Sequence, residues 1–168
     1  MTNLHPGLIM IAFGLLIMVM PKKASRWLVL AGSAFAAGAA FYLEPGAKLN
    51  YEFVGNLKLE LINIDPLAKC FLLVFTVISV IAGIYQMANK ESSKWEKAMS
   101  IIYAGSGISV VLANDWISFI GFWELMALSS IFIVWAGGTE EARRSSFRYM
   151  VMHLFGGNLL LLFHLPRR

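Results

Sequence analysis

A short list of ionisable side chains lies within stretches of sequence that are mostly apolar: Lys69, Glu124, His153 and His164. Glu124 lies furthest from the ends of its stretch, about nine residues after Asp115, or ~13 Å along an α-helix. An ionised carboxylate in the middle of an apolar helix is costly unless it meets a cation or water. Glu124 is therefore either a group that exchanges protons or a static polar group that hydrogen-bonds a neighbouring helix.

The stretch that contains Glu124, residues 115–135 (DWISFIGFWELMALSSIFIVW), is long enough to cross a bilayer as a helix. An ionisable residue inside such a helix is a functional hypothesis by default. Without a nearby cation, Glu124 is expected to be protonated. A lysine on a neighbouring helix would favour the ionised form, and an acid and a base whose separation varies form a proton-loading switch.

His153 has two interpretations, and Lys69 has a simple one. His153 comes one apolar stretch after Glu124 and could belong to the same hydrated proton path. Alternatively, His153 is a packed, hydrogen-bonded residue beside Gly156 and Gly157. Lys69 lies in the first turn of its stretch, where its ammonium group can reach the membrane interface while its methylene groups remain in apolar surroundings.

The composition is that of a membrane protein. Of 168 residues, 58% are hydrophobic and 14% are charged, whereas soluble domains have roughly 25% charged residues. The net charge is +4, but the basic residues form short clusters between apolar stretches, which indicates membrane topology rather than a nucleic-acid-binding face. The single cysteine, Cys70, excludes a disulfide within the chain and is expected to be a small buried apolar side chain.

Six apolar stretches predict an all-α membrane protein with six transmembrane helices. In the third stretch, Asp65 is the expected N-cap and Pro66 the first helical residue. The stretches cover about residues 6–20, 27–43, 66–88, 98–113, 115–135 and 147–165.

Residues 51–61, between the second and third expected helices, predict a β-hairpin. Apolar and polar residues alternate on both sides of Gly55 and Asn56, a pair that favours a two-residue turn. A hairpin alone is only marginally stable, so we expect this one to lie across helix ends or on a partner.

The loop charges predict the orientation in the membrane. Lysine plus arginine numbers 3, 2, 3, 0 and 3 in the five successive loops, so the odd-numbered loops are expected on the cytoplasmic side. The N-terminus and the hairpin would then be extracytoplasmic, and the protein would be a multi-pass protein of the cell (inner) membrane. The basic C-terminal residues would lie on the unfavoured side, which suggests a chain truncated after its sixth helix.

Residues 113–130 (ANDWISFIGFWELMALSS) resemble the fifth-helix signature of the antiporter-like subunits of respiratory complex I, membrane-bound hydrogenases and Mrp-type sodium/proton antiporters. Residues 62–85 resemble the third helix of that family. Residues 148–157 (RYMVMHLFGG) resemble its sixth helix, in the style of the D-type subunits of Mrp antiporters. The resemblance covers nearly the whole chain in the right order.

The resemblance implies that Glu124 is the family's fifth-helix glutamate, which pairs with a lysine on the seventh helix. Lysines or histidines on later helices would continue the hydrophilic axis, and this chain has neither those helices nor that lysine. The chain is thus similar to the N-terminal portion of such a subunit. Residues 1–113 would hold helices one to four and the hairpin, and residues 114–168 would begin the proton-translocating domain, with Trp123, Gly156 and Gly157 as packing residues.

These expectations lead to two hypotheses for function. The chain is a membrane subunit of a proton-translocating complex, either an Mrp-type antiporter or a complex linked to quinone or ferredoxin electron transfer. Alternatively, it is a small structural or assembly subunit without transport of its own. Its expected partners are the lipid bilayer, other membrane subunits and protons, with sodium left open, and not nucleic acid. We identify no catalytic chemistry, metal site or cofactor site, although the parent complex could be an NADH:quinone oxidoreductase or a relative.

Overall fold

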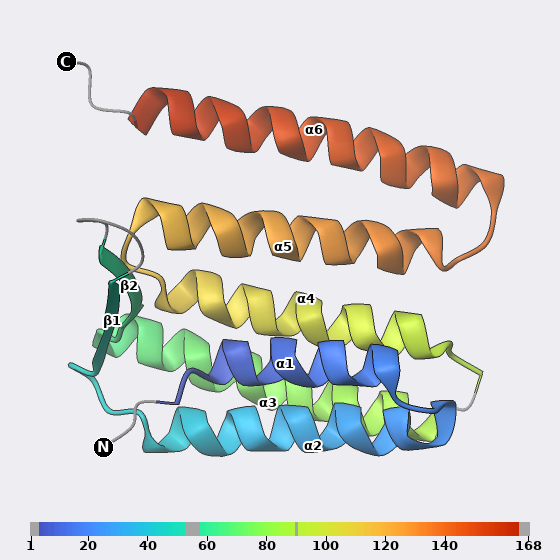
Figure 1. Ribbon diagram of the computed structural model, residues 1–168, viewed down its shortest axis with the longest axis horizontal. Coiled ribbons are helices and arrows are strands. Elements are labelled where there is room, and N and C mark those ends of the chain that lie inside the picture. Colours follow the sequence, from blue (N-terminus) through green and yellow to red (C-terminus); the bar gives the residue numbers. More distant parts are fainter. Residues whose placement is uncertain (1–3, 53–57, 90, 165–168) are drawn as a thin grey trace.

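The computed structural model describes residues 4–52, 58–89 and 91–164, and in these residues it has six helices and one two-stranded sheet. The helices run side by side, and the sheet lies at one end of the bundle (Figure 1). A mostly helical chain with a hairpin between its second and third helices is therefore confirmed. The elements in chain order are α1 (Pro6–Val19), α2 (Lys22–Tyr42), β1 (Lys48–Glu52), β2 (Lys58–Asn63), α3 (Pro66–Ala88), α4 (Lys94–Leu112), α5 (Trp116–Trp135) and α6 (Glu140–His164).

Side-chain caps and prolines fix where the helices begin. Asp65 is the N-cap of α3, and its carboxylate accepts a hydrogen bond of 2.6 Å from the backbone N–H of Ala68. Pro66 is the first residue of α3, where its missing N–H costs nothing. The predicted roles of Asp65 and Pro66 are thus confirmed. α1 begins in the same way, with His5 as N-cap and Pro6 as first residue.

Three helices begin earlier than the apolar stretches predict. α2 begins at Lys22 rather than near Trp27, α4 at Lys94 rather than near Ala98, and α6 at Glu140 rather than near Phe147. Lysine, arginine and glutamate are good helix formers, so their polarity ends the apolar stretch without ending the helix. As a result, several basic residues assigned to loops lie in the first turns of these helices.

The hairpin is an antiparallel pair in which Lys48 lies opposite Asn63, with an irregularity between Leu49 and Asn50. The strands extend beyond the predicted range of 51–61 at both ends, because the pairing continues to the base of the hairpin. The predicted turn at Gly55 and Asn56 falls in residues 53–57, outside the described part of the chain.

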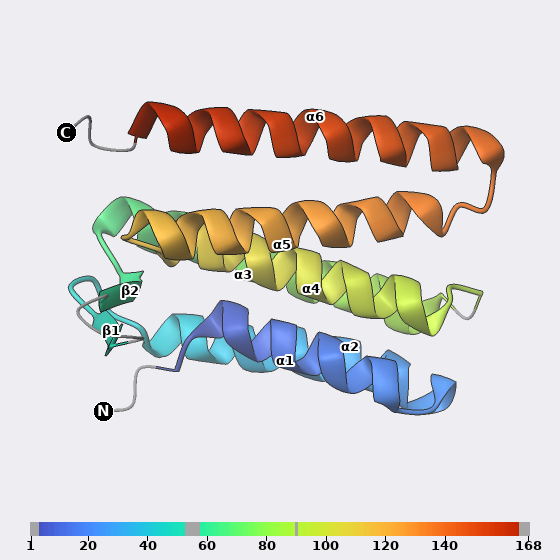
Figure 2. The ribbon, with the colours of Figure 1, turned by 45° about the horizontal axis from the view of Figure 1, so that its top comes forward.

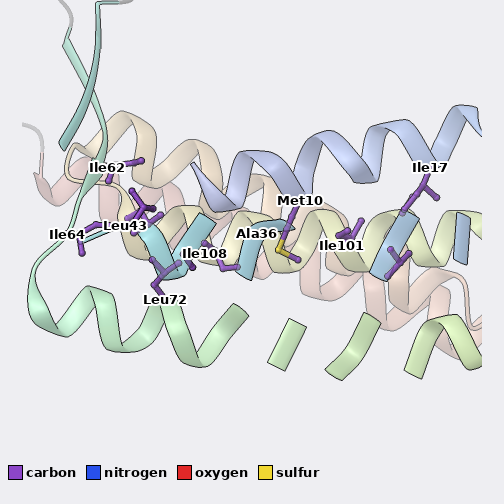
Figure 3. Close-up of a cluster of buried hydrophobic side chains, with 13 residues drawn as sticks. Met10, Ile17, Ala36, Leu43, Ile62, Ile64, Leu72, Ile101 and Ile108 are labelled. Atoms are coloured by element: carbon purple, nitrogen blue, oxygen red, sulfur yellow. The ribbon is translucent and has the colours of Figure 1, made fainter. Parts of the chain in front are cut away.

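The buried core lies among α1 to α4 and the base of the hairpin. Figure 3 shows Met10 and Ile17 of α1 close to Ile101 and Ile108 of α4, with side chains from α2, α3 and β2 around them. Among the described residues, α6 contacts α5 alone, so it lies at the edge of the bundle (Figure 2). Cys70 is exposed on α3, which corrects the prediction of a buried thiol: its face of α3 points away from the core.

Three helices of the described residues are long and apolar enough to cross a membrane: α2 with 21 residues, α3 with 23 and α5 with 20. In α3 and in α5, only 22% of the most apolar 18-residue segment is buried, so most of this apolar surface faces outward. α1 is apolar but shorter, with 14 residues. The first turns of α4 and α6 contain acidic residues. The first turns of the other four helices contain none.

The contact between α1 and α4 depends on glycines in both helices. A methyl carbon built at Gly105 would lie 2.7 Å from the carbonyl oxygen of Gly7 and 2.8 Å from Cβ of Met10. A carbon built at Gly14 would lie 2.4 Å from Ile102. Small residues allow helix backbones to approach this closely, which fixes the spacing of the core.

We predict that Gly105→Ala destabilises the protein by about 1–3 kcal/mol, because the added methyl group forces α1 and α4 apart. Gly38→Ala is the matched control, since Gly38 lies in α2 with no atom within 4 Å of the added carbon. Reversible unfolding of the detergent-solubilised protein, followed by circular dichroism, measures both. Equal stability of the two variants would contradict the close contact.

Candidate functional site

Glu124 lies on α5, eight residues after its first residue, Trp116, and its side chain is half-buried. The carboxylate points toward α6: a methyl carbon built at the buried Gly157 would lie 2.7 Å from Oε1 of Glu124. The missing side chain at position 157 therefore leaves the space that the carboxylate occupies. Gly157 takes part in the contact as expected, whereas Gly156 is exposed, with no atom within 4 Å of an added carbon.

Glu124 makes no ion pair and no side-chain hydrogen bond to any described residue. The acidic residue Glu140 differs in this respect, since it forms ion pairs with Arg143 and Arg144 at the start of α6. That a cation partner for Glu124 comes from a helix beyond this chain stays a prediction. The central feature of the site is therefore a carboxyl group that faces α6 from an apolar helix and has no ion-pair partner among the described residues.

His153 and Trp123 lie in the same contact between α5 and α6. Their ring centroids are 5.5 Å apart, and the ring of Tyr149 lies 5.8 Å from that of His153. Nε2 of His153 and Nε1 of Trp123 are buried without a hydrogen-bond partner among the described residues. Buried polar atoms usually have a partner, so these two nitrogens call for a water molecule or a polar group outside the described residues. His153 packs against Trp123 and Tyr149 and makes no hydrogen bond to Glu124.

A second polar cluster, which the sequence analysis did not identify, joins the hairpin to three helices. The carboxylate of Asp115, the N-cap of α5, accepts a hydrogen bond of 2.8 Å from the backbone N–H of Glu60. The backbone N–H of Asn114 donates to the carbonyl of Glu60 at 2.9 Å, and its side-chain amide donates to the Glu60 carboxylate. Nε2 of His5 lies 3.1 Å from the carbonyl oxygen of Leu61. The prediction that the hairpin lies across helix ends is therefore confirmed.

The electrostatics of this cluster favour a neutral His5 and an ionised Asp115. Burial lowers the pKa of His5 from 6.5 to about 4. Nδ1 of His5 accepts a hydrogen bond from Leu8, so the proton of the neutral ring is on Nε2 and points to Leu61. Burial acts to raise the pKa of Asp115, but hydrogen bonds from Ser118, Glu60 and Ile117 outweigh it and hold that pKa below its usual value.

Lys69 and Lys97 both bind backbone carbonyl groups. Nζ of Lys69 donates to the carbonyls of Ala40, Phe41 and Leu43, at the C-terminal end of α2. A cation at a helix C-terminus is favourable, so Lys69 acts as a cap for α2 rather than only reaching an interface.

Lys97 has an exposed fraction of only 2%, although its charge suggested a loop residue. Its Nζ donates to the carbonyl of Asn89 at 3.0 Å and to the hydroxyl of Ser92 at 2.7 Å. The sequence signal for its position is Ser93, a good N-cap residue four positions earlier, which places Lys97 in the first turns of α4.

No protein-family model matches the chain. Over 98 residues the sequence is 26% identical to an uncharacterised protein of the archaeon Methanocaldococcus jannaschii. The matched region is 58% of this chain and spans only about a fifth (20%) of that relative. This similarity assigns neither a family nor an activity, so a function has to be argued from the site. Among the described residues, no group of three His, Cys, Asp or Glu side chains could hold a metal ion.

We predict that acid weakens the fold through His5. Its folded-state pKa is about 4 and its unfolded value is 6.5, so the stabilisation is present above pH 6.5 and is lost as the pH falls toward 4. Between pH 7.5 and pH 5 this loss is about 2 kcal/mol for a two-state transition. Unfolding of the wild type and of His5→Gln at both pH values measures it.

His5→Gln is the control because glutamine can still donate to the Leu61 carbonyl but does not titrate. Its stability should change less with pH than that of the wild type. A pH dependence equal in the two proteins would show that other groups, such as Asp115, account for it.

Proposed function

We propose that this chain is a membrane subunit of a proton-translocating complex, and that Glu124 takes up and releases the proton. One observation carries the proposal: the carboxyl group of Glu124 projects from an apolar helix into the contact with α6 and has no ion-pair partner among the described residues. Structural carboxylates inside proteins are normally paired, whereas unpaired ones at functional sites exchange protons.

The membrane part of the proposal rests on the arrangement of apolar and basic residues. α2, α3 and α5 are long and apolar enough to span, and α1, α4 and α6 run beside them (Figure 1). The connections α1–α2, α3–α4 and α5–α6 lie together at the end opposite the hairpin (Figure 1). Since the helices that follow these connections carry the basic residues near their starts, we propose six transmembrane helices in an inner membrane, with this end cytoplasmic and the N-terminus extracytoplasmic.

In the proposed mechanism, Glu124 alternates between a protonated and an ionised state. The ionised state requires a cation or water, because α5 offers neither. The cation would approach from an element other than the described helices, as the resemblance to antiporter-like subunits implies. Gly157 leaves space in which the carboxylate can move, and water bound to Nε1 of Trp123 and Nε2 of His153 would connect it to the rest of the path.

The resemblance favours an antiporter-like protein, similar to the D-type subunits of Mrp antiporters or to the large membrane subunits of complex I. The complex would move protons, with sodium exchange left open, and would be driven either by an ion gradient or by quinone- or ferredoxin-linked electron transfer. The chemistry of Glu124 is the same in each case: a carboxyl group binds and releases a proton within apolar surroundings.

A second candidate function is that of a structural or assembly subunit. It is favoured by α6, which contacts α5 alone among the described elements and exposes large apolar side chains, with exposed fractions of 62% for Phe147, 75% for Met152 and 70% for Phe155. In this case another helix would cover α6, and Glu124 would form a fixed hydrogen bond to it.

We predict that Glu124→Gln in the intact complex lowers proton translocation roughly tenfold or more, because an amide cannot bind and release a proton. Glu124→Asp retains a titratable group and should retain part of the activity. The measurement is proton uptake into vesicles, normalised to the amount of assembled complex. Normal translocation by assembled Glu124→Gln complex would support the structural role instead.

We also predict that Gly157→Ala impairs proton translocation more than Gly156→Ala does. The added methyl group would lie 2.7 Å from Oε1 of Glu124 and displaces the carboxylate, whereas at Gly156 it meets nothing within 4 Å. Because the carboxylate is the end of a flexible side chain, stability should change little in either variant. Equal translocation rates in the two variants would show that the position of this carboxylate is unimportant.

A further inference from the structure

A basic pocket of about 330 Å³ is lined by residues near the α1–α2 and α3–α4 connections. These connections lie at one end of the bundle (Figure 1). It lies at the opposite end from the hairpin and is formed by residues that the proton path does not use. Four cationic side chains and one hydroxyl line it, and none of the described lining residues is acidic: Lys22, Lys23, Arg26, Ser92 and Lys97.

Three of these cations come from the first turns of α2. This helix has Pro21 as N-cap, no side-chain cap and no acidic residue in its first turn. A helix N-terminus carries a partial positive charge, so Lys22, Lys23 and Arg26 add positive charge where an acidic residue is usual. None of the three forms an ion pair with a described residue. The resulting repulsion is relieved if an anion binds.

The fourth cation, Lys97, forms the floor of the pocket. It is buried and its hydrogen bonds go to neutral oxygens of Asn89 and Ser92. Glu96 acts on it electrostatically from the preceding position, but no carboxylate oxygen of the described residues lies within 4 Å of its Nζ. A buried ammonium group without an anion is costly, and an anion in the pocket would compensate its charge.

The neighbouring Lys94 belongs to a different contact. Its Nζ donates to the carbonyl of Met18 at 3.0 Å, near the end of α1, and lies 5.7 Å from the ring centre of Trp95. Lys94 therefore caps the end of α1 and is not among the described residues that line the pocket.

Two arginines at the start of α6 lie at the same end of the bundle as this pocket, but both are paired with an acidic residue. Arg143 and Arg144 lie 3.7 Å and 3.5 Å from the carboxylate of Glu140. Glu140 also lines a second pocket, of about 390 Å³, together with Arg143, Arg144 and Arg148. Of these two pockets, only the one at the start of α2 therefore has no acidic residue in its described lining.

We propose that the basic pocket binds the phosphate group of an anionic phospholipid on the cytoplasmic side of the membrane. Phosphate oxygens accept hydrogen bonds from ammonium and guanidinium groups, and arginine can donate two in parallel. Apolar side chains for the acyl chains are exposed near this end, with exposed fractions of 82% for Val19, 68% for Trp27 and 54% for Trp95. Tryptophan is common at the level of lipid headgroups. The lipid assignment rests on the membrane part of the proposed function.

The test is native mass spectrometry of the detergent-solubilised full chain with equal amounts of phosphatidylglycerol and phosphatidylcholine. The wild type should retain phosphatidylglycerol preferentially. The triple variant Lys22→Gln, Lys23→Gln, Arg26→Gln should bind it roughly tenfold or more weakly, since three phosphate-facing cations are lost. The matched control Arg143→Gln, Arg144→Gln, Arg148→Gln removes the same charge at the same end and should bind like the wild type.

Equal losses in the two triple variants would overturn the proposal, because binding would then follow total charge only. Calorimetry with inorganic phosphate on lipid-free protein separates the two sources of phosphate. Binding of inorganic phosphate without retention of phosphatidylglycerol would overturn the lipid assignment. Circular dichroism confirms that both variants are folded. Since the readout is lipid binding, a loss at this pocket is distinguishable from a loss of proton transfer at Glu124.

Discussion

One physical constraint governs the contact between α5 and α6 and so the proposed site: a carboxyl group on an apolar helix must be neutral, hydrated or paired with a cation. Within the described residues Glu124 has no cation, and the space that it occupies exists because position 157 carries no side chain. The neighbouring Trp123 and His153 each leave a buried nitrogen without a partner among those residues. The contact between α5 and α6 therefore brings together a carboxyl group and two buried nitrogens that have no partner among the described residues.

The rest of the fold supplies a frame for this contact. α1 and α4 are held together through Gly7, Gly14 and Gly105, and the core extends from this pair to α2, α3 and the hairpin base. The hairpin joins α1 to the start of α5 through Leu61 and Glu60, so α5 is anchored at the end where Asp115 caps it. Among the described elements, α6 contacts α5 alone. The proposed proton site thus lies between an anchored helix and one whose other faces remain uncovered by the described part of the chain.

The sequence predicted the elements better than the contacts between them. Asp65 and Pro66 fix the start of α3 by local chemistry, and both predictions were correct. The starts of α2, α4 and α6 were wrong by several residues, because charged helix formers extend a helix beyond its apolar stretch. Lys97 and His5 were missed for a different reason: their burial depends on oxygens of Ser92 and Leu61 brought close by tertiary packing. Glu124 was singled out from the sequence as a carboxyl group within an apolar stretch, and its proton-transfer role stays a prediction. That Gly157 leaves space for its carboxylate required the structure.

We propose that Glu124 holds a proton in this chain and loses it when a cation approaches. Infrared difference spectroscopy of the membrane-reconstituted chain, wild type against Glu124→Gln, tests this claim most directly. We expect a band of a protonated carboxyl group that is present near neutral pH in the wild type and absent from the variant. A wild-type spectrum in which Glu124 contributes only an ionised carboxylate band under these conditions would contradict the claim.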